Sequence, residues 1–254
     1  MKKILVLFCF TAVLCAGRTY CQISDFTLDS CYFANTIEVH QVNIDSNILA
    51  LRCAAEYGLQ PGYNELIVFG LRFANMGNHD AAFNGLGLYF DSCHSHLHLE
   101  NFGTCDLLNE CGEVIRQGGK IGLNLYDGLN YMEFLLLPNL GNCSDTWLNQ
   151  YGTPDYSLQL HPPNDNFNGE ENMGLSAGYC DTYSNGTWGN NIRSNDIPNG
   201  NYYLRPRCNA SAYFNQGLNI FPDQFTVPVM LTGQFPPSPA LPRSISITSF
   251  NICY

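Results

Sequence analysis

Positive charge is scarce in this sequence. Of 254 residues, 11 are Lys or Arg against 22 Asp or Glu, which gives a formal net charge of −11 at pH 7. Without Lys2 and Lys3 the balance is 9 against 22, or −13. Binding to nucleic acid needs a basic surface that neutralises phosphates, so we expect no nucleic-acid partner. An acidic surface attracts cationic ligands, and it equally keeps a protein soluble.

Long apolar runs are absent beyond the first 15 residues. The sequence begins with two lysines and an apolar run from Ile4 to Cys15, and small residues follow the run. This is the pattern of a secretory signal peptide, so we expect cleavage between residues 16 and 22 and a secreted, extracellular protein. Because a transmembrane helix needs roughly 20 apolar residues, we expect no membrane span. The predicted organisation is a signal peptide over 1–21 and a single domain over 22–254.

Cysteine usage fits an exported chain. Of 12 cysteines, Cys9 and Cys15 lie in the apolar run and ten lie beyond it. Ten cysteines in such a chain predict up to about five disulfide bonds, and cleavage after Cys21 would leave an odd number. Three sequons, at Asn142, Asn185 and Asn209, are candidate glycosylation sites. We therefore expect a disulfide-linked glycoprotein.

Helical periodicity is also lacking, because no long stretch places apolar residues at the 3.6-residue spacing of an amphipathic helix. Apolar runs and period-2 alternation, bounded by Gly, Pro and Asn, predict strands instead. The clearest candidates are Glu65–Phe73, Lys120–Tyr126, Tyr156–Leu160, Gln224–Leu231 and Ser244–Ile252. The predicted turns are Tyr63-Asn64, Gly77-Asn78, Asp127-Gly128 and Asn199-Gly200. The predicted fold class is all-β, an antiparallel β-sandwich with long loops, linked by disulfides.

Three of the six histidines fall in one short segment, Cys93-His94-Ser95-His96-Leu97-His98. Side chains alternate across a strand, so the three histidines share a face while Ser95 and Leu97 point the other way. In a flat strand the outer two α-carbons would lie about 13 Å apart, so the strand must bend or bulge for all three imidazoles to reach one ion. Imidazole suits copper, zinc, iron or nickel, and the triplet alone does not select among them. The alternatives are an incidental cluster on a solvated strand, and Cys93 as a fourth ligand instead of a disulfide partner.

The segment Tyr89-Phe-Asp-Ser-Cys-His-Ser-His-Leu-His98, with Phe102 and Asp106-Leu-Leu108 after it, resembles the copper-binding block of the lysyl oxidases. Further blocks resemble that family in the same order, and together they cover about residues 64 to 231. These blocks are Leu71-Arg-Phe73, Asn75-Met-Gly-Asn-His-Asp80, Gly119-Lys-Ile-Gly-Leu-Asn-Leu-Tyr-Asp127, Gly174-Leu-Ser-Ala-Gly-Tyr-Cys-Asp-Thr-Tyr183 and Asn199-Gly-Asn-Tyr-Tyr-Leu204. The domain over 22–254 is therefore expected to be a lysyl oxidase-like catalytic domain.

The resemblance implies copper and a cofactor, lysine tyrosylquinone, which forms when copper and dioxygen oxidise a tyrosine and a lysine amine adds to the ring. Carried over position by position, the implied copper ligands are His94, His96 and His98, and the implied cofactor residues are Lys120 and Tyr183. One fact of composition agrees, because Lys120 is the only lysine after Lys2 and Lys3. Tyr183 is one of 15 tyrosines, and only its flanking residues distinguish it from a packing residue.

The reaction implied by the resemblance is the oxidative deamination of a primary amine. The substrate would be a small amine or the lysine side chain of an extracellular protein, and dioxygen would be the acceptor. In such enzymes the cofactor carries the chemistry, while the protein positions it and supplies a base. Asp181, two residues before Tyr183, and Asp106 are the candidate bases. Either aspartate could instead be a turn residue or a hydrogen-bond partner of the metal ligands.

The sequence departs from the animal lysyl oxidases at several positions. Asp91 stands where they carry another histidine, and Leu88 and Phe90 replace their tryptophans. The cysteine of the tyrosine block, Cys180, is displaced by one position, which raises a pairing with Cys208 as an alternative disulfide. The chain between the lysine and tyrosine blocks is also longer. These departures bear on cofactor formation and on substrate choice more than on metal binding.

Two other functions account for part of the pattern. One is a non-catalytic secreted protein that binds metal or matrix on the same scaffold. The other is a cupin-like metal enzyme, because His94-x-His96-x-x-x-Glu100 has cupin spacing. That enzyme would need a fourth ligand in a later strand, where His161 is the only histidine, and it leaves His98 without a role.

Overall fold

The structure is a computed structural model. It describes residues 26–44, 53–54, 57–75, 81–82, 87–91, 93, 96–100, 102–118, 122–125, 129–130, 173–175, 179–187, 189–208 and 223–248. Over these ranges the chain is mostly strand, every strand pairing is antiparallel, and the helix α1 (Ser30–Asn35) is short. The all-β, disulfide-linked fold class is therefore confirmed. In the described part of the chain, none of the helical structure has the length and apolar character needed to cross a membrane.

The elements follow one another along the chain. In order, they are β1 (Phe26–Leu28), α1 (Ser30–Asn35), β2 (Glu38–Ile44), β3 (Gly62–Val68), β4 (Leu71–Asn75), β5 (Ala81–Ala82), β6 (Leu88–Asp91), β7 (His96–Leu99), β8 (Gly103–Leu108), β9 (Val114–Gln117), β10 (Leu129–Asn130), β11 (Gly174–Leu175), β12 (Tyr179–Tyr183), β13 (Asn191–Arg193), β14 (Gly200–Cys208), β15 (Val227–Thr232) and β16 (Ser244–Ile247).

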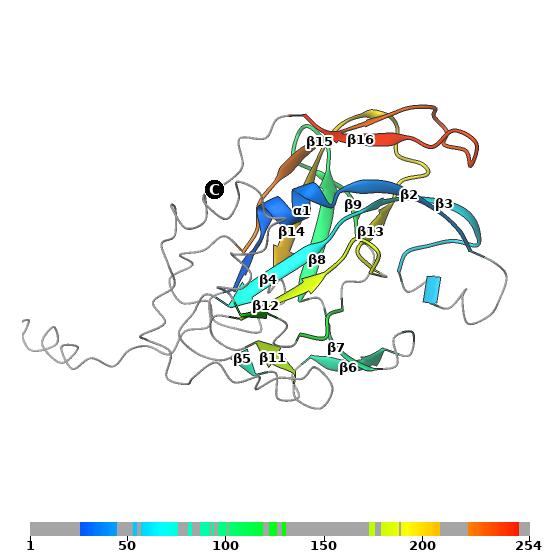
Figure 1. Ribbon diagram of the computed structural model, residues 1–254. Helices are drawn as coiled ribbons and strands as arrows, with labels where there is room; N and C mark the ends of the chain where they lie inside the picture. Colours follow the sequence, from blue (N-terminus) through cyan, green and yellow to red (C-terminus); the bar gives the residue numbers. More distant parts are fainter. Residues whose placement is uncertain are drawn as a thin grey trace, which may run out of the picture.

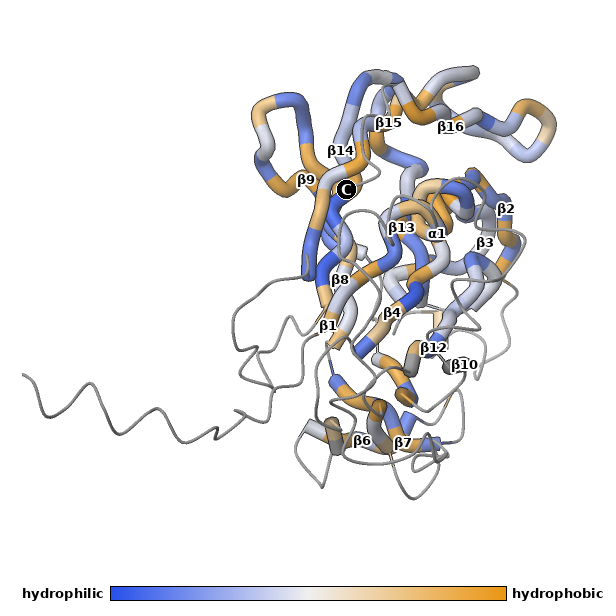
Figure 2. The backbone as a smooth tube through the Cα atoms, turned by 60° about the vertical axis from the view of Figure 1, so that its left-hand side comes forward, coloured by the Kyte–Doolittle hydropathy of each residue, from blue (hydrophilic) through white to orange (hydrophobic). Residues whose placement is uncertain are grey.

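Three larger sheets and two strand pairs make up the described fold. The sheets have the orders β1-β4-β12-β10, β13-β3-β2 and β16-β15-β14-β8-β9, and the pairs are β11-β5 and β6-β7. The β6-β7 pair lies at one end of the molecule and β15-β16 at the other, as both views show (Figure 1, Figure 2). The histidine segment is thus carried on a two-stranded ribbon outside the three larger sheets.

One apolar core joins the three larger sheets. Its fully buried side chains include Phe73 from β4, Ile67 from β3 and Leu107 from β8. The ring of Phe102 packs edge-on against Phe73 and Phe26, at centroid distances of 5.5 and 5.0 Å. Phe102 lies just after β7 in the chain, so its burial anchors the end of the histidine ribbon in the core.

The strand predictions are confirmed where the alternation is clear. The predicted Gln224–Leu231 contains most of β15, and the predicted Ser244–Ile252 contains β16, with residues beyond 248 outside the described part. The predicted Glu65–Phe73 is two strands, β3 and β4, because the chain leaves the sheet at Phe69 and Gly70. Within Lys120–Tyr126 only 122–125 is described, and it forms a single bridge instead of a strand. Tyr156–Leu160 lies outside the described residues.

One predicted turn is wrong. Tyr63-Asn64 lies inside β3, and the chain turns just before the strand, which begins at Gly62 with a φ of +85°. The Asn64 amide stabilises that turn from within the strand, because its Nδ2 donates to the carbonyl oxygens of Gln60 and Gly62. Of the predicted turn Asn199-Gly200, Asn199 is a bend directly before β14, and Gly200 is already the first residue of that strand. The turns predicted at 77–78 and 127–128 lie outside the described residues.

A disulfide joins Cys53 to Cys93 across 40 residues. Cys105 and Cys111 take part in no disulfide, so the upper bound predicted from the cysteine count is not reached. Cys180 and Cys208 are both buried and form no disulfide with one another, which overturns that alternative pairing.

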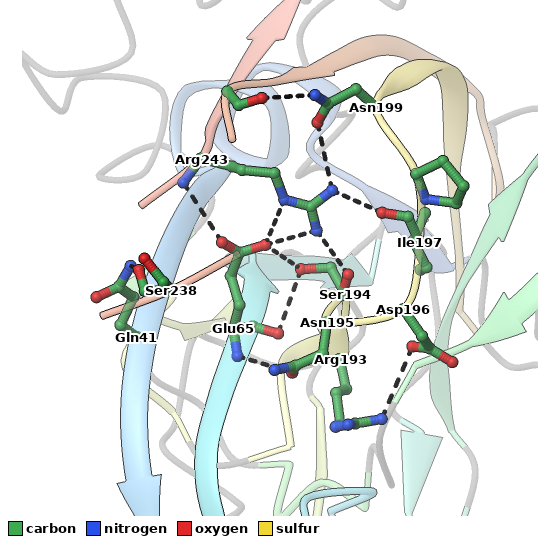
Figure 3. Close-up of polar contacts among 12 residues, drawn as sticks. Gln41, Glu65, Arg193, Ser194, Asn195, Asp196, Ile197, Asn199, Ser238 and Arg243 are labelled. Carbon is green, nitrogen blue, oxygen red and sulfur yellow. Dashed lines mark hydrogen bonds and ion pairs between the residues drawn. The ribbon is translucent and has the colours of Figure 1, made fainter. Parts of the chain in front are cut away.

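A fully buried ion pair ties β3 to the chain before β16. The Arg243 guanidinium donates to Glu65 Oε1 through Nε at 2.8 Å and Nη2 at 2.6 Å, and both side chains are 0 % exposed (Figure 3). The backbone carbonyl oxygens of Ser194 and Ile197 accept hydrogen bonds from the guanidinium at 2.6 Å each, and Asn199 Oδ1 accepts a longer one from Nη1 at 3.4 Å. Burial of two charges is tolerable here because nearly every donor and acceptor of the pair is satisfied.

Candidate metal centre

The β6-β7 ribbon sorts its side chains onto two faces. Its register places Tyr89 opposite His98 and Asp91 opposite His96. Because side chains alternate along both strands, these four polar residues share one face. Phe90 points to the other face and is 63 % exposed. The sequence prediction that His96 and His98 lie on the same side of a strand, away from Leu97, is therefore confirmed.

The two histidines of β7 bring the same ring nitrogen together, at hydrogen-bond distance. His96 Nε2 and His98 Nε2 lie 2.7 Å apart, with ring centroids 4.7 Å apart. Two nitrogens bound to one ion at about 2.0 Å are about 2.8 Å apart when they are cis in a tetragonal site and about 3.3 Å apart in a tetrahedral one. Small rotations of either ring span this range. The pair therefore fits a shared transition metal without selecting the element.

A buried carboxylate stands behind His98. Asp91 Oδ2 lies 3.0 Å from His98 Nδ1, and the two side chains are 0 % and 4 % exposed. The hydroxyl of Tyr57 donates to the same oxygen at 3.2 Å. The Cys93 amide donates to Asp91 Oδ1 at 2.8 Å. Both oxygens of the Asp91 carboxylate therefore accept hydrogen bonds. The carboxylate lies beside Nδ1, on the other side of the His98 ring from Nε2.

Cys93 is tied to Cys53 by the disulfide, and this confirms the disulfide reading over metal ligation. The disulfide packs against a second apolar cluster, which includes Tyr57, Leu66 and Val68. The turn between β6 and β7 is thereby anchored to the β3 side of the molecule.

The segment 122–125 runs along the outer side of β7. Leu99 and Leu123 exchange backbone hydrogen bonds, with N···O distances of 2.7 and 3.3 Å. Gly122 lies directly beside the β6-β7 ribbon, because a Cβ there would overlap the Tyr89 hydroxyl and come within 3.0 Å of His98 Nδ1. A side chain at position 122 would require Tyr89 and His98 to move.

Tyr183 reaches the same segment from the other side. It is the last residue of β12, and its hydroxyl donates to the Asn124 carbonyl oxygen at 2.7 Å. Its ring is partly buried and packs edge-on against Phe73 at 6.2 Å. The chain 122–125 therefore contacts His98 at one end and Tyr183 two residues later.

Asp181 lies two residues before Tyr183 on β12, and so on the same face of that strand. It is 2 % exposed, and its Oδ1 accepts from the Thr182 amide at 2.7 Å. A buried carboxylate beside the predicted cofactor tyrosine fits the position of a base.

Asp106 is held elsewhere. It lies on β8, is 2 % exposed, and its Oδ2 receives Arg205 Nη2 at 2.8 Å and Arg207 Nη2 at 3.0 Å from β14. These two ion pairs account for the carboxylate as a link between neighbouring strands. Burial raises the pKa of the adjacent Cys105 thiol well above its usual value, so that thiol stays protonated and inert.

Two predicted site residues, His94 and Lys120, lie outside the described residues. Within the described ranges, no group of three or more His, Cys, Asp and Glu side chains is arranged to hold one ion. Of the predicted site residues, the structure brings His96 and His98 together. Tyr183 contacts the segment 122–125, which lies between it and β7.

Sequence reasoning missed the polar partners of His98. Tyr89 and Asp91 alternate with period two just before the turn, as His96 and His98 do just after it. An antiparallel hairpin closed by residues 92–95 would place all four on one face. The alternation is visible in the sequence, but it predicts these contacts only if the register of the hairpin is known.

Adding a methyl group at Gly122 is expected to disturb the histidines of the β6-β7 ribbon. In Gly122→Ala the new Cβ displaces Tyr89 and presses on His98, so we expect metal affinity to fall about 10-fold, as with other changes to residues that orient a ligand. Titration of the metal-free protein with Cu²⁺ measures this.

Gly186→Ala is the matched control, because a Cβ there meets only Ser184 Oγ at 3.8 Å. Equal affinities for Gly122→Ala and Gly186→Ala would show that the contact with the ribbon is unimportant.

Comparison with models of known protein families finds no match for this sequence. A search of curated proteins also finds no match. The likeness to lysyl oxidases therefore remains a prediction from the motifs.

Proposed function

We propose that this protein is a secreted, copper-dependent amine oxidase that resembles the lysyl oxidases. The observation that carries the proposal is the meeting of three predicted blocks at one place. Gly122 of the lysine block lies beside His98 of the copper block, and Asn124, two residues after Gly122, accepts a hydrogen bond from Tyr183 of the tyrosine block. These blocks are far apart in the sequence, and their meeting is what the proposed site requires.

The described residues fit a copper ion. His96 and His98 present converging Nε2 atoms, and imidazole is a good ligand for copper. Asp91 accepts a hydrogen bond from the far side of His98, which is the usual arrangement behind a ligating histidine. His94, next in the same Cys-His-x-His-x-His pattern, is the proposed third ligand.

Lys120 and Tyr183 are the proposed precursors of lysine tyrosylquinone. Lys120 precedes Gly122 by two residues, and two residues of chain span at most about 7 Å. When formed, this cofactor supplies an electrophilic carbonyl that accepts the amine and its two electrons. The Asn124 carbonyl oxygen, which accepts from the Tyr183 hydroxyl, fixes the orientation of that side chain.

The overall reaction converts a primary amine, dioxygen and water to an aldehyde, ammonia and hydrogen peroxide. One proton must leave the carbon beside the substrate nitrogen, and we assign its removal to Asp181. That carboxylate is buried and shares a strand face with Tyr183. We do not assign it to Asp106, which is bound by two arginines. The substrate is a small amine or a lysine side chain of an extracellular protein.

The cupin-like alternative finds less support. It requires Glu100 as a ligand, and Glu100 is exposed beyond the end of β7. His98 has no role in that alternative, yet it is buried and its Nε2 lies 2.7 Å from that of His96. The non-catalytic metal-binding protein differs from our proposal in one chemical fact, the absence of a bond between Lys120 and Tyr183.

Digestion with a lysine-specific protease tests that bond. After removal of Lys2 and Lys3 the chain contains one lysine, so the reduced protein can be cut only after Lys120. We expect copper-loaded protein exposed to air to resist this cut, because its Lys120 amine is bound to the ring of Tyr183. Metal-free protein kept without dioxygen should give two fragments.

Mass spectrometry of a chymotryptic digest should then show one cross-linked peptide that contains both residues. The Tyr183→Phe variant is the matched control, and it should be cut whether or not copper is present. Complete cleavage of copper-loaded wild-type protein would reject the proposed function and favour the non-catalytic alternative.

A further inference from the structure

We infer that Asp91 is a positioning residue for the metal, acting through His98. The inference rests on the proposed metal site, and it assigns a role to the residue at which this chain departs from the animal lysyl oxidases. The carboxylate does not face the point where the two Nε2 atoms converge. It contacts Nδ1, on the opposite side of the His98 ring, so the imidazole stands between Asp91 and that point.

The contact fixes which nitrogen of His98 carries the proton. An ionised carboxylate can only accept a hydrogen bond, so the 3.0 Å contact places a proton on Nδ1, and the Tyr89 hydroxyl, 3.3 Å from the same nitrogen, is the longer of its two contacts. The lone pair of a neutral imidazole then lies on Nε2, the atom that faces His96. The negative charge behind the ring also makes Nε2 a stronger electron donor to a metal.

The carboxylate itself is held in place from two directions. Tyr57 donates to Oδ2 at 3.2 Å and the Cys93 amide donates to Oδ1 at 2.8 Å. Tyr57 is 2 % exposed within the second apolar cluster, and Cys93 is fixed by its disulfide to Cys53. Rotation of Asp91 would break both bonds in a buried region, where an unsatisfied donor is costly. The geometry therefore holds His98 in one tautomer before any metal binds.

Asp91→Asn tests this inference with little change in shape. The Cys93 amide contacts Oδ1 of Asp91, whereas His98 Nδ1 contacts Oδ2. An asparagine has an oxygen at only one of these two places, so it cannot accept from both donors. If the oxygen stays with Cys93, the amide nitrogen faces Nδ1 and favours the tautomer protonated at Nε2. In that tautomer the ligating position is blocked by a proton. Tyr57→Phe is the comparison variant, since it removes one of the two donors that hold Asp91 while the Cys93 amide and His98 Nδ1 still contact the carboxylate.

The first measurement uses the metal-free mature protein. Nitrogen-15 NMR of the histidine rings reports the tautomer, and the His98 signals are assigned by their loss in His98→Gln. We expect an Nδ1–H tautomer in wild type and in Tyr57→Phe, and an Nε2–H tautomer or a mixture in Asp91→Asn. Thermal unfolding of all three proteins checks that each is folded, and a structural role alone would leave the tautomer unchanged.

The second measurement is titration with Cu²⁺ against a competing chelator. We expect about 10- to 100-fold weaker binding for Asp91→Asn and a change of less than about threefold for Tyr57→Phe. An unchanged tautomer in Asp91→Asn, or an unchanged affinity, overturns the inference. An equal loss in Tyr57→Phe also overturns it, because packing and not the carboxylate would then be responsible.

The two proposals fail in different ways. If copper binds with the expected differences but Lys120 is still cleaved by the protease, the amine oxidase proposal fails and the role of Asp91 stands. If the cross-link forms in wild type but Asp91→Asn binds copper as tightly, the role of Asp91 fails and the amine oxidase proposal stands.

Discussion

Replacing Lys120 with arginine is expected to reduce amine-dependent release of hydrogen peroxide to background. Arginine keeps the positive charge, but its guanidinium stays protonated and does not add to a ring carbon at neutral pH. No other lysine remains after Lys2 and Lys3 to take its place. A peroxidase-coupled assay with a small primary amine measures the loss, and copper content by elemental analysis should be unchanged.

The lost activity should depend on the place of the lysine and not on the number of lysines. Arg116→Lys introduces a lysine on β9, where the arginine side chain is 31 % exposed and pairs with Asp196. We expect full activity from Arg116→Lys alone and none from Lys120→Arg combined with Arg116→Lys. Peroxide release by Lys120→Arg at the wild-type rate would contradict an oxidase that depends on this lysine.

Strands are predictable here where burial alternates. In β15, the pattern from Val227 to Thr232 alternates between buried and more exposed positions, and the sequence alone indicates it. The run Glu65–Phe73 does not alternate, since both sides of β3 and β4 are covered. A continuous apolar run contains no signal for the point at which the chain leaves one sheet and enters another.

That point is set by a contact distant in the sequence. Gly70 separates β3 from β4, and a Cβ there would come within 2.6 Å of the Tyr32 ring and 2.9 Å of Thr36 Oγ1. Its amide donates to that same Thr36 hydroxyl at 2.8 Å. The break is therefore caused by the packing of α1 and the residues after it, which local propensity does not contain.

In the candidate site, too, some contacts follow from the local sequence pattern and others depend on the folded chain. The shared face of His96 and His98 follows from the two-residue period of a strand, and the sequence alone predicts it. The contact of Asp91 with His98 joins two strands, so it depends on the hairpin register and on a turn whose length the sequence does not define. Contacts across more than 50 residues, such as Tyr183 with Asn124, become visible only in the folded chain.

Removing one member of the buried Glu65–Arg243 pair is expected to have the largest effect on stability. Arg243→Met leaves the Glu65 carboxylate at 0 % exposure without its guanidinium, and it leaves the carbonyl oxygens of Ser194 and Ile197 without their donors (Figure 3). Loss of one partner of a buried ion pair costs about 3–5 kcal/mol. Urea unfolding at pH 7 of the oxidised protein measures the change.

The double variant Glu65→Met with Arg243→Met separates the charge from the packing. It removes the carboxylate that Arg243→Met leaves buried, so we expect it to be no less stable than the single variant, although it also loses the contacts of Glu65 with the Ser194 hydroxyl and with the backbone amide of residue 243. Arg116→Met is the control for an exposed pair. Arg116 and Asp196 are 31 % and 58 % exposed, and such pairs contribute about 0–1 kcal/mol. If Arg243→Met and Arg116→Met unfold at the same urea concentration, the buried network is not what holds β3 to the chain before β16.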